Sequence, residues 1–485
     1  MTFGMLPDDV LLNVFDFFVE DFKSFKEKSW ILKEPRVDGW VTLAHVCQRW
    51  RSIVFQSPLR LNLRLLCTPK TPARDALDVW PRLPLIIWDV RSIFDGKSSS
   101  VGNIIAALEH NDRACRIELK HYQSLEMGYI TNSAAMHRPF PELTHLLLKK
   151  FESFEYGPGP ILSDSFLGGT APRLRSLELD NVPFPGLPKL LLSTTHLVNL
   201  SLHKIPRSSD IPPEAMVTSL SALTNLEFLC LEFRYAQPPS HPALEGQRPP
   251  PPPLTRSILP SLTKFRFNGF SEYLEEILAG IDAPRLDELQ IIYFNQIIFG
   301  TPQLLQFFSR RPTLRVPEEG HIAFNSKAII VKFPSQTSEY DVLSVEVPFT
   351  APERQLSSLE QVCASSFPFL STLEGLYIFE DQNAPRWQDD IENTLWLALL
   401  RPFAAVKSLY LCEKIIPHIA PALQELVGDR TTEVLPTLEN IFLETLQPPG
   451  PLQGGIEKFV AVRQLTSHPV AVSRWDMDRK KYRYP

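Results

Sequence analysis

The chain has 485 residues, 44% of them apolar, so it can bury a large core and form two or three domains or one long repeat array. Its formal net charge of −6 is small and acidic, which argues against nucleic acid or an anionic membrane surface as a partner. The 45 prolines, set against 20 glycines, favour many short elements joined by stiff connections.

Two amphipathic helices are predicted at the start of the chain. The first follows Pro7, which suits a first helical turn, and has Asp8 and Asp9 near the positive end of the helix dipole. Its apolar stripe consists of Leu11, Val14, Phe15 and Phe18, and that of the second helix consists of Leu43, Val46, Cys47, Trp50 and Val54. Residues 23–39 between them are predicted to form a loop or a short extra helix. Two such helices bury little by themselves and need a partner surface.

A different pattern takes over from residue 114, where "ACRIEL" is a degenerate first copy of the template Leu-x-x-Leu-x-Leu. Several copies follow a short lead-in that contains proline, such as "APRL" or "LPSL". The full copies begin at residues 143, 174, 197, 226, 262, 286, 373, 406 and 438. This pattern is typical of a leucine-rich-repeat array with irregular periods, in which each unit contributes one short strand and a helix or turn. The sequence therefore predicts an α/β fold with a mainly parallel sheet.

Two interruptions of the array have their own character. Residues 235–257 include five consecutive prolines and are predicted to be a solvated polyproline loop, with an SH3- or WW-type ligand as the alternative. The interval 297–372 contains "HIAFNSKAIIVKF" and "DVLSVEVPF", which are strand-like by alternation and β-branched content. They are predicted to be either divergent repeats or an inserted hairpin.

No catalytic motif is found, so an enzyme is not expected and no cofactor is predicted. The six cysteines include no Cys-x-x-Cys pair, which predicts no zinc site and reduced thiols in the cytoplasm and/or nucleus. No signal peptide or segment that could span a membrane is predicted. His145 and His203 occupy outward strand positions and are interpreted as surface contacts rather than metal ligands. The basic and aromatic residues that close the chain are predicted to pack on the last repeat rather than to bind nucleic acid.

The two opening helices resemble an F-box. The residues that carry the resemblance are Leu6, Pro7, Asp8 and Asp9, followed by Val46, Cys47, Trp50 and Arg51. The match covers residues 5–55, and the spacer 23–39 is longer than the family usually has. The segment that follows resembles the F-box-like proteins of mushroom-forming fungi, which also carry irregular leucine-rich repeats.

This resemblance implies the substrate receptor of a Skp-cullin-F-box ubiquitin ligase, which docks a Skp-type adaptor and, through it, cullin and RING subunits. The alternative is a repeat-based interaction scaffold that acts outside ubiquitination. Phe15 and Trp50 are expected to hold the helices together. The residues expected to contact the adaptor are Leu6, Pro7, Val10, Leu11, Val14 and Val46.

A protein substrate is expected on the open face of the repeats, to which alternation sends the third, fifth and seventh residues of each copy. The middle copies place mostly polar groups there, such as Ser201 and His203 in one copy, although the next copy places Phe228 and Cys230 outward beside Glu232. The later copies place aromatic residues there, which form the predicted substrate site: Tyr377, Phe379, Tyr410 and Phe442. The alternative is that Trp475, Tyr482 and Tyr484 of the tail fold back and cover them.

The predicted domains are therefore a helical F-box-like domain at 1–60, a connecting segment at 61–112, the repeat array at 113–470 and a tail at 471–485.

Overall fold

The computed structural model describes residues 6–24, 39–58, 60–79, 82–90, 101–121, 124–151, 160–206, 211–234, 256–294, 301–310, 317–325, 328–334, 341–348, 356–357, 359–361, 363, 367, 369–380, 392–444 and 453–475. The chain divides into two compact units, Met1–Cys230 and Leu231–Pro485. The division falls inside a strand that runs from Phe228 to Phe233 without a break. Among the described helices, none combines the length and the apolar character that crossing a bilayer requires.

Three helices open the first unit: α1 (Asp8–Ser24), α2 (Gly39–Val46) and α3 (Gln48–Gln56). The apolar stripe of α1 turns inward at Leu11 and Phe15, which are fully buried together with Val54 of α3. The Phe15 and Trp50 rings lie 4.8 Å apart, so they tie α1 to α3 as predicted. Both predicted helices are present, and the second is divided at Cys47, whose Sγ accepts the N–H of Trp50 at the start of α3. Residues 25–38 of the spacer lie outside the described part of the chain.

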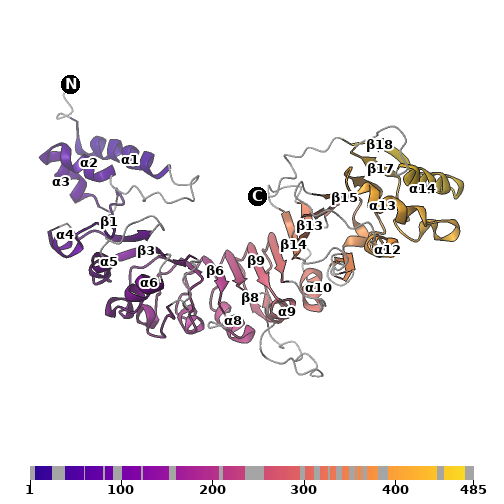
Figure 1. The fold of residues 1–485 in the computed structure, drawn as a ribbon. Coiled ribbons are helices and arrows are strands. Elements are labelled where there is room, and N and C mark those ends of the chain that lie inside the picture. The colour runs from indigo at the N-terminus through magenta and orange to yellow at the C-terminus, as the bar shows by residue number, and fades with distance from the viewer. Residues whose placement is uncertain are drawn as a thin grey trace. The chain divides into compact units, whose positions relative to one another are not determined.

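The rest of the first unit alternates strands with helices or short turns. Its strands are β1 (Leu65–Cys67), β2 (Leu85–Val90), β3 (Ala114–His121), β4 (His145–Lys150), β5 (Ser176–Asp180), β6 (Asn199–Ile205) and β7 (Phe228–Phe233). The intervening helices are α4 (Ala73–Val79), α5 (Val101–Leu108), α6 (Ser124–Thr131), α7 (Leu187–Leu191) and α8 (Pro213–Leu220), with 3₁₀ turns η2 (Ala134–His137) and η3 (Phe166–Gly169). The strands from β1 to β6 pair in parallel, in chain order. The helices lie along one side of them (Figure 1).

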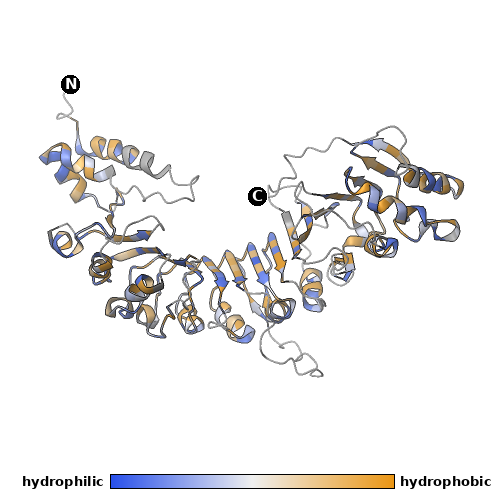
Figure 2. Ribbon diagram, viewed as in Figure 1, coloured by the Kyte–Doolittle hydropathy of each residue, from blue (hydrophilic) through white to orange (hydrophobic). Residues whose placement is uncertain are grey.

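The leucine template forms strands for a simple reason. The first leucine of a copy closes a turn, as where the N–H of Leu174 bonds the carbonyl of Ala171, and the fourth and sixth residues then point to the same face of the pleat. Parallel pairing places Leu146, Leu177 and Leu200 side by side in one column. In all nine full copies the three template residues are buried. Figure 2 shows the resulting alternation of apolar and polar bands along strands such as β9.

The second unit continues the same plan. Its strands are β8 (Ser257–Ile258), β9 (Lys264–Gly269), β10 (Ile281–Asp282), β11 (Glu288–Tyr293), β12 (Glu319–Phe324), β13 (Ala328–Pro334), β14 (Asp341–Pro348), β15 (Gly375–Glu380), β16 (Ser408–Leu411), β17 (Asn440–Leu443) and β18 (Ala471–Arg474). The helical elements are α9 (Ser271–Gly280), α10 (Pro302–Ser309), η5 (Leu370–Thr372), α12 (Asn393–Leu400), α13 (Ile416–Gln424), η6 (Gly428–Thr432) and α14 (Gln453–Leu465). The prediction of an α/β chain with a mostly parallel sheet is confirmed within each unit.

An antiparallel insertion distinguishes this unit. Strand β13 pairs antiparallel with both β12 and β14, whereas β14 joins β11 and β12 joins β15 in parallel. Of the two interpretations of the interval 297–372, the inserted hairpin is therefore the correct one.

The repeat architecture is longer than predicted at both ends. Strands β1 and β2 pair in parallel with the array, so part of the predicted connecting segment 61–112 belongs to the sheet. The run Leu85–Trp88 is buried at every residue, and such a continuous apolar run does not display the leucine spacing. At the other end, β18 pairs with β17, so residues 471–474 of the predicted tail form the last strand. Residues 235–255 of the proline-rich segment lie outside the described part of the chain.

A buried carboxylate joins two helices of the second unit and leads to a prediction. Glu275 of α9 accepts the backbone N–H groups of Gln303, at 2.5 Å, and Leu304, at 2.9 Å, in the first turn of α10. Burial raises the pKa of Glu275 to about 7, although the two N–H groups act in the opposite direction. The folded chain then binds more protons than the unfolded chain between the ordinary carboxyl pKa and about 7, so stability falls as the pH rises through that window. We expect Glu275→Gln to remove this slope in denaturant unfolding measured at a series of pH values; an unchanged slope would assign it to another group.

Candidate functional site

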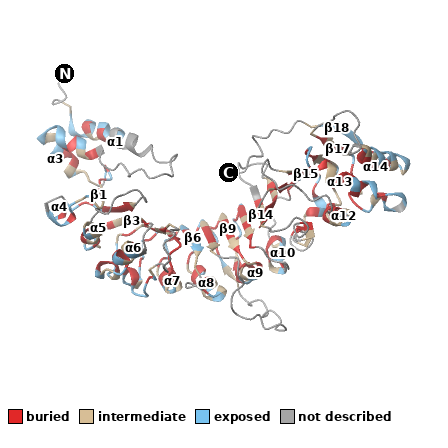
Figure 3. Ribbon diagram, viewed as in Figure 1, coloured by how far each residue is buried: buried red, intermediate tan, exposed pale blue. Residues whose placement is uncertain are grey.

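The N-terminal helices present the predicted adaptor contacts in two different environments. Val10, Val14 and Val46 are exposed by 37%, 43% and 56% of their surface. Pro7 is exposed and Leu6 is half-buried. Leu11 is fully buried, because it lies on the side of α1 that packs with Phe15 in the core of the helical domain, and we correct its assignment as a surface contact. Figure 3 shows exposed residues on the outer sides of α1 and α3.

Polar contacts fix the geometry of this helical domain. The Arg49 guanidinium of α3 donates to the backbone carbonyl of Leu6, at 2.6 Å, and to the Asp8 carboxylate, at 2.5 Å, so it holds the start of α1 against α3. The indole N–H of Trp40 donates to the carbonyl of Arg64, just before β1. The Arg49 contacts therefore fix the start of α1, the helix that carries Val10 and Val14, while Trp40 ties α2 to the segment before β1.

The predicted substrate residues form a stacked column across three strands. Tyr377 of β15, Tyr410 of β16 and Phe442 of β17 are opposite one another in the parallel register. Their rings are stacked in nearly parallel planes, with centroids 4.0 Å and then 4.5 Å apart. The column thus forms as the alternation of the repeat predicts.

One end of this column is covered. His321 of the inserted hairpin packs against the Tyr377 ring at 4.7 Å, and Trp475 lies edge-on to Tyr377 at 5.7 Å and to Tyr410 at 5.4 Å. Tyr377 is only 8% exposed and Phe379 only 2%, so we correct both predicted surface contacts: neighbouring strands bury them. Tyr410 and Phe442 are half-buried and keep part of their surface accessible. The alternative prediction was that three aromatic residues of the tail cover this site. Trp475 does cover part of the column, whereas Tyr482 and Tyr484 lie outside the described residues.

A charged hollow that the sequence interpretation missed adjoins the column. It measures about 270 Å³, and Tyr410 is one of its lining residues. Its lining contains the ion pair between the Lys407 ammonium and the Glu374 carboxylate, 2.8 Å apart. The remaining lining residues are Glu318, Glu319, Gly375, Ser408, Glu439 and Asn440. The sequence contains a pattern that could have predicted this hollow. The second residue of each of the last three repeats is charged: Glu374, Lys407 and Glu439.

The outward histidines lie in different surroundings. His145 of β4 is half-buried, and its Nδ1 lies 2.9 Å from the hydroxyl of Thr144. His203 of β6 has Cys230 and Glu232 as neighbours, and these three residues form a possible set of metal ligands in the part of the chain that the structure describes. The sequence interpretation placed all three in outward columns but did not bring them together.

The parallel strands, the leucine columns and the helices that follow them are consistent with a leucine-rich-repeat-like α/β protein. No protein-family model matches the chain, and no curated protein matches it. Among solved structures, the leucine-rich repeat-containing protein LegL7 from Legionella pneumophila is similar over 82% of this chain and 97% of that chain, with 13% sequence identity and a TM-score of 0.25. The repeat class follows from the parallel strands and the buried leucine columns of this chain itself.

Proposed function

We propose that this protein is the substrate-recognition subunit of a Skp-cullin-F-box type ubiquitin ligase. The observation that carries the proposal is the exposed apolar face of a small helical domain that has a core of its own. In this proposal the helices dock a Skp-type adaptor, and the repeats hold a protein substrate.

The exposed face of α1 has the composition of a docking surface. Val10, Val14 and Phe17 follow one another at spacings of four and three residues, so they share one side of the helix. Phe17 is exposed by 75% of its surface, and the two valines by about two-fifths. Their neighbours Leu11 and Phe15 already form the internal core, so the domain does not need the exposed set for its own packing. Grouped exposed apolar residues of this kind are typical of protein interaction sites.

The repeats supply a surface that suits the receptor role. The accessible parts of Tyr410 and Phe442, together with the adjoining hollow, combine aromatic rings with charged groups. Aromatic residues beside polar rims are common at the centres of protein interfaces. We place the substrate there. The chain then needs no catalytic residue, because the assembled ligase brings the substrate to the ubiquitin-charged enzyme and the gain comes from proximity.

Replacing Val14 by Glu tests the docking surface. The substitution puts a charge at the centre of the exposed face, where burial against an adaptor would leave that charge unpaired, and we expect adaptor affinity to fall by about 30-fold or more. The free energy of unfolding should change by no more than about 0.5 kcal/mol, because the Val14 side chain is exposed. The measurement is titration of the purified full-length protein with a Skp-type adaptor, with circular dichroism as the check on folding.

Leu125→Glu is the matched control, because Leu125 is 74% exposed on α6, well outside the three opening helices. It should bind the adaptor like the wild type. A Val14→Glu protein that keeps wild-type affinity would refute the docking surface. Co-purification of cullin with the wild-type chain separates the ligase subunit from a scaffold that acts outside ubiquitination, since the scaffold would bring down no cullin.

A further inference from the structure

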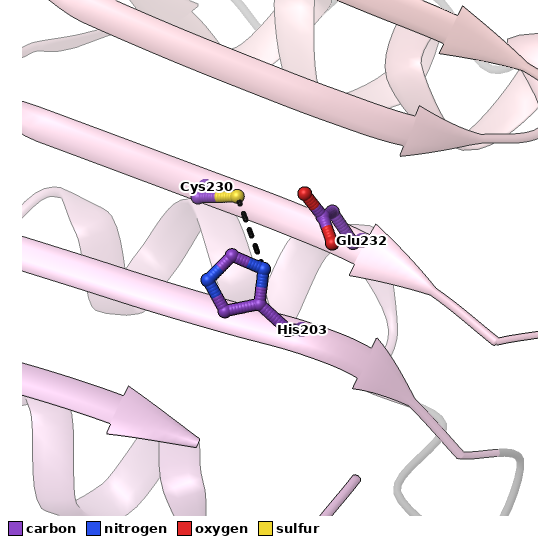
Figure 4. Close-up of side chains that lie close together, drawn as sticks. All are labelled: His203, Cys230 and Glu232. Carbon is purple, nitrogen blue, oxygen red and sulfur yellow. Dashed lines mark hydrogen bonds between the residues drawn. The ribbon is translucent and has the colours of Figure 1, made fainter. Parts of the chain in front are cut away.

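Three side chains with metal-binding donors converge on strands β6 and β7. His203 lies near the end of β6, and Cys230 and Glu232 are two residues apart on β7, so they share one side of that strand. The Cys230 Sγ lies 3.8 Å from the His203 Nδ1, and one ligand atom from each of the three residues lies within 4.8 Å of the others. Figure 4 shows the imidazole, the sulfur and the carboxylate gathered around one space.

The separation of the Cys230 sulfur and the His203 nitrogen is close to that of two donors in a zinc site. Zinc binds sulfur at about 2.3 Å and nitrogen or carboxylate oxygen at about 2.0–2.2 Å, which places the donor atoms of a tetrahedron about 3.3–3.6 Å apart. The Cys230 sulfur and the His203 nitrogen are already near that spacing at 3.8 Å, and the donor atoms of the set, which lie within 4.8 Å of one another, would have to draw closer when an ion binds. Cys230 is fully buried, whereas His203 and Glu232 are half-buried, so the ion can enter from the open side.

We propose that His203, Cys230 and Glu232 bind a zinc ion. Imidazole and thiolate are ligands that zinc prefers, whereas calcium and magnesium take oxygen ligands. Three protein ligands leave a fourth position, which water or a side chain of a bound partner can fill. On binding, the Cys230 thiol loses its proton to the solvent and forms the sulfur–zinc bond, while the histidine binds as the neutral imidazole.

The site would link β6 to β7 on the face that the repeat leaves open. A bound ion therefore has two consequences that can be measured: the chain becomes more stable in proportion to zinc occupancy, and the thiolate acquires the spectrum of a metal complex. Neither depends on the proposed ligase role.

The test uses the full-length protein after removal of metals with a chelator. We expect one zinc ion per chain by titration calorimetry, a higher melting temperature with zinc, and a thiolate-to-metal charge-transfer band when cobalt(II) is added in place of zinc. Cys230→Ser should abolish the band and weaken zinc binding by at least about tenfold, since even outer-shell substitutions cost about 10–100-fold. The matched controls are Cys115→Ser on β3 and His145→Gln on β4, which should bind zinc like the wild type.

His203→Gln and Glu232→Gln carry the test if Cys230→Ser fails to fold, because both positions are half-buried. Each should lower zinc affinity by at least about tenfold while the metal-free melting curve stays close to that of the wild type. A wild-type chain with no saturable zinc binding, or with binding that survives these substitutions, would overturn the site. Cobalt binding without a thiolate band would also overturn it, because Cys230 would then not be a ligand.

Discussion

Arg463→Ala is expected to destabilise the C-terminal repeats by roughly 3–5 kcal/mol. Arg463 of α14 is fully buried, and its guanidinium donates to the backbone carbonyls of Val434, Leu435 and Pro436 at 3.2, 2.6 and 3.3 Å. Burial lowers the pKa of this side chain, but an arginine keeps its charge at neutral pH. Truncation would leave three carbonyls without these donors and a cavity beside the Phe459 ring, over which the guanidinium now lies at 5.3 Å.

Denaturant unfolding, with hydrogen exchange of the α14 amides, measures this effect. Arg463→Lys should recover only part of the loss, because one ammonium cannot reproduce the planar fork of donors that meets several carbonyls. The matched control is Lys458→Ala on the same helix, where the side chain is exposed and a change within about 0.5 kcal/mol is expected. Equal stability of Arg463→Ala and the wild type would mean that water replaces the guanidinium without cost.

Phe15→Ala is expected to lower the free energy of unfolding of the N-terminal helical domain by roughly 3–5 kcal/mol, which is enough to unfold a small domain. Phe15 is fully buried, and its contact with Trp50 is a direct link between α1 and α3. Hydrogen exchange should report loss of protection in the three helices while the leucine strands remain protected. Adaptor binding should be lost together with the fold, whereas Val14→Glu should lose binding and keep the fold.

Phe17→Ala is the control for this experiment, since Phe17 lies on the same helix and is 75% exposed. Its effect on stability should stay within about 0.5 kcal/mol. If Phe15→Ala leaves the protection of the helices unchanged, the packing of α1 on α3 is not what stabilises the domain.

The sequence by itself determined where the strands of the leucine template lie and which way their side chains face. Strand geometry has a period of two residues, and the leucine template has the same local spacing, so the buried columns follow directly from it. The same alternation placed Tyr410 and Phe442 on the open face and assigned outward positions to His203, Cys230 and Glu232 without bringing the three together. The pairing of Phe15 with Trp50 was also within reach, because both lie on apolar stripes of helices that need each other.

The tertiary structure decided which neighbour covers each side chain. Tyr377 and Phe379 point outward in their own repeat, but the inserted strand β12 pairs with β15 and buries them, with Trp475 adding to the cover of Tyr377. The convergence of His203 with Cys230 joins residues 27 positions apart. From the sequence alone, Arg463 is an ordinary polar residue of a helix. Only the folded chain shows that it is buried against the backbone around Leu435. Periodicity specifies a face within one element, whereas burial and ligand convergence depend on contacts between elements that are distant in the sequence, and no local spacing encodes those contacts.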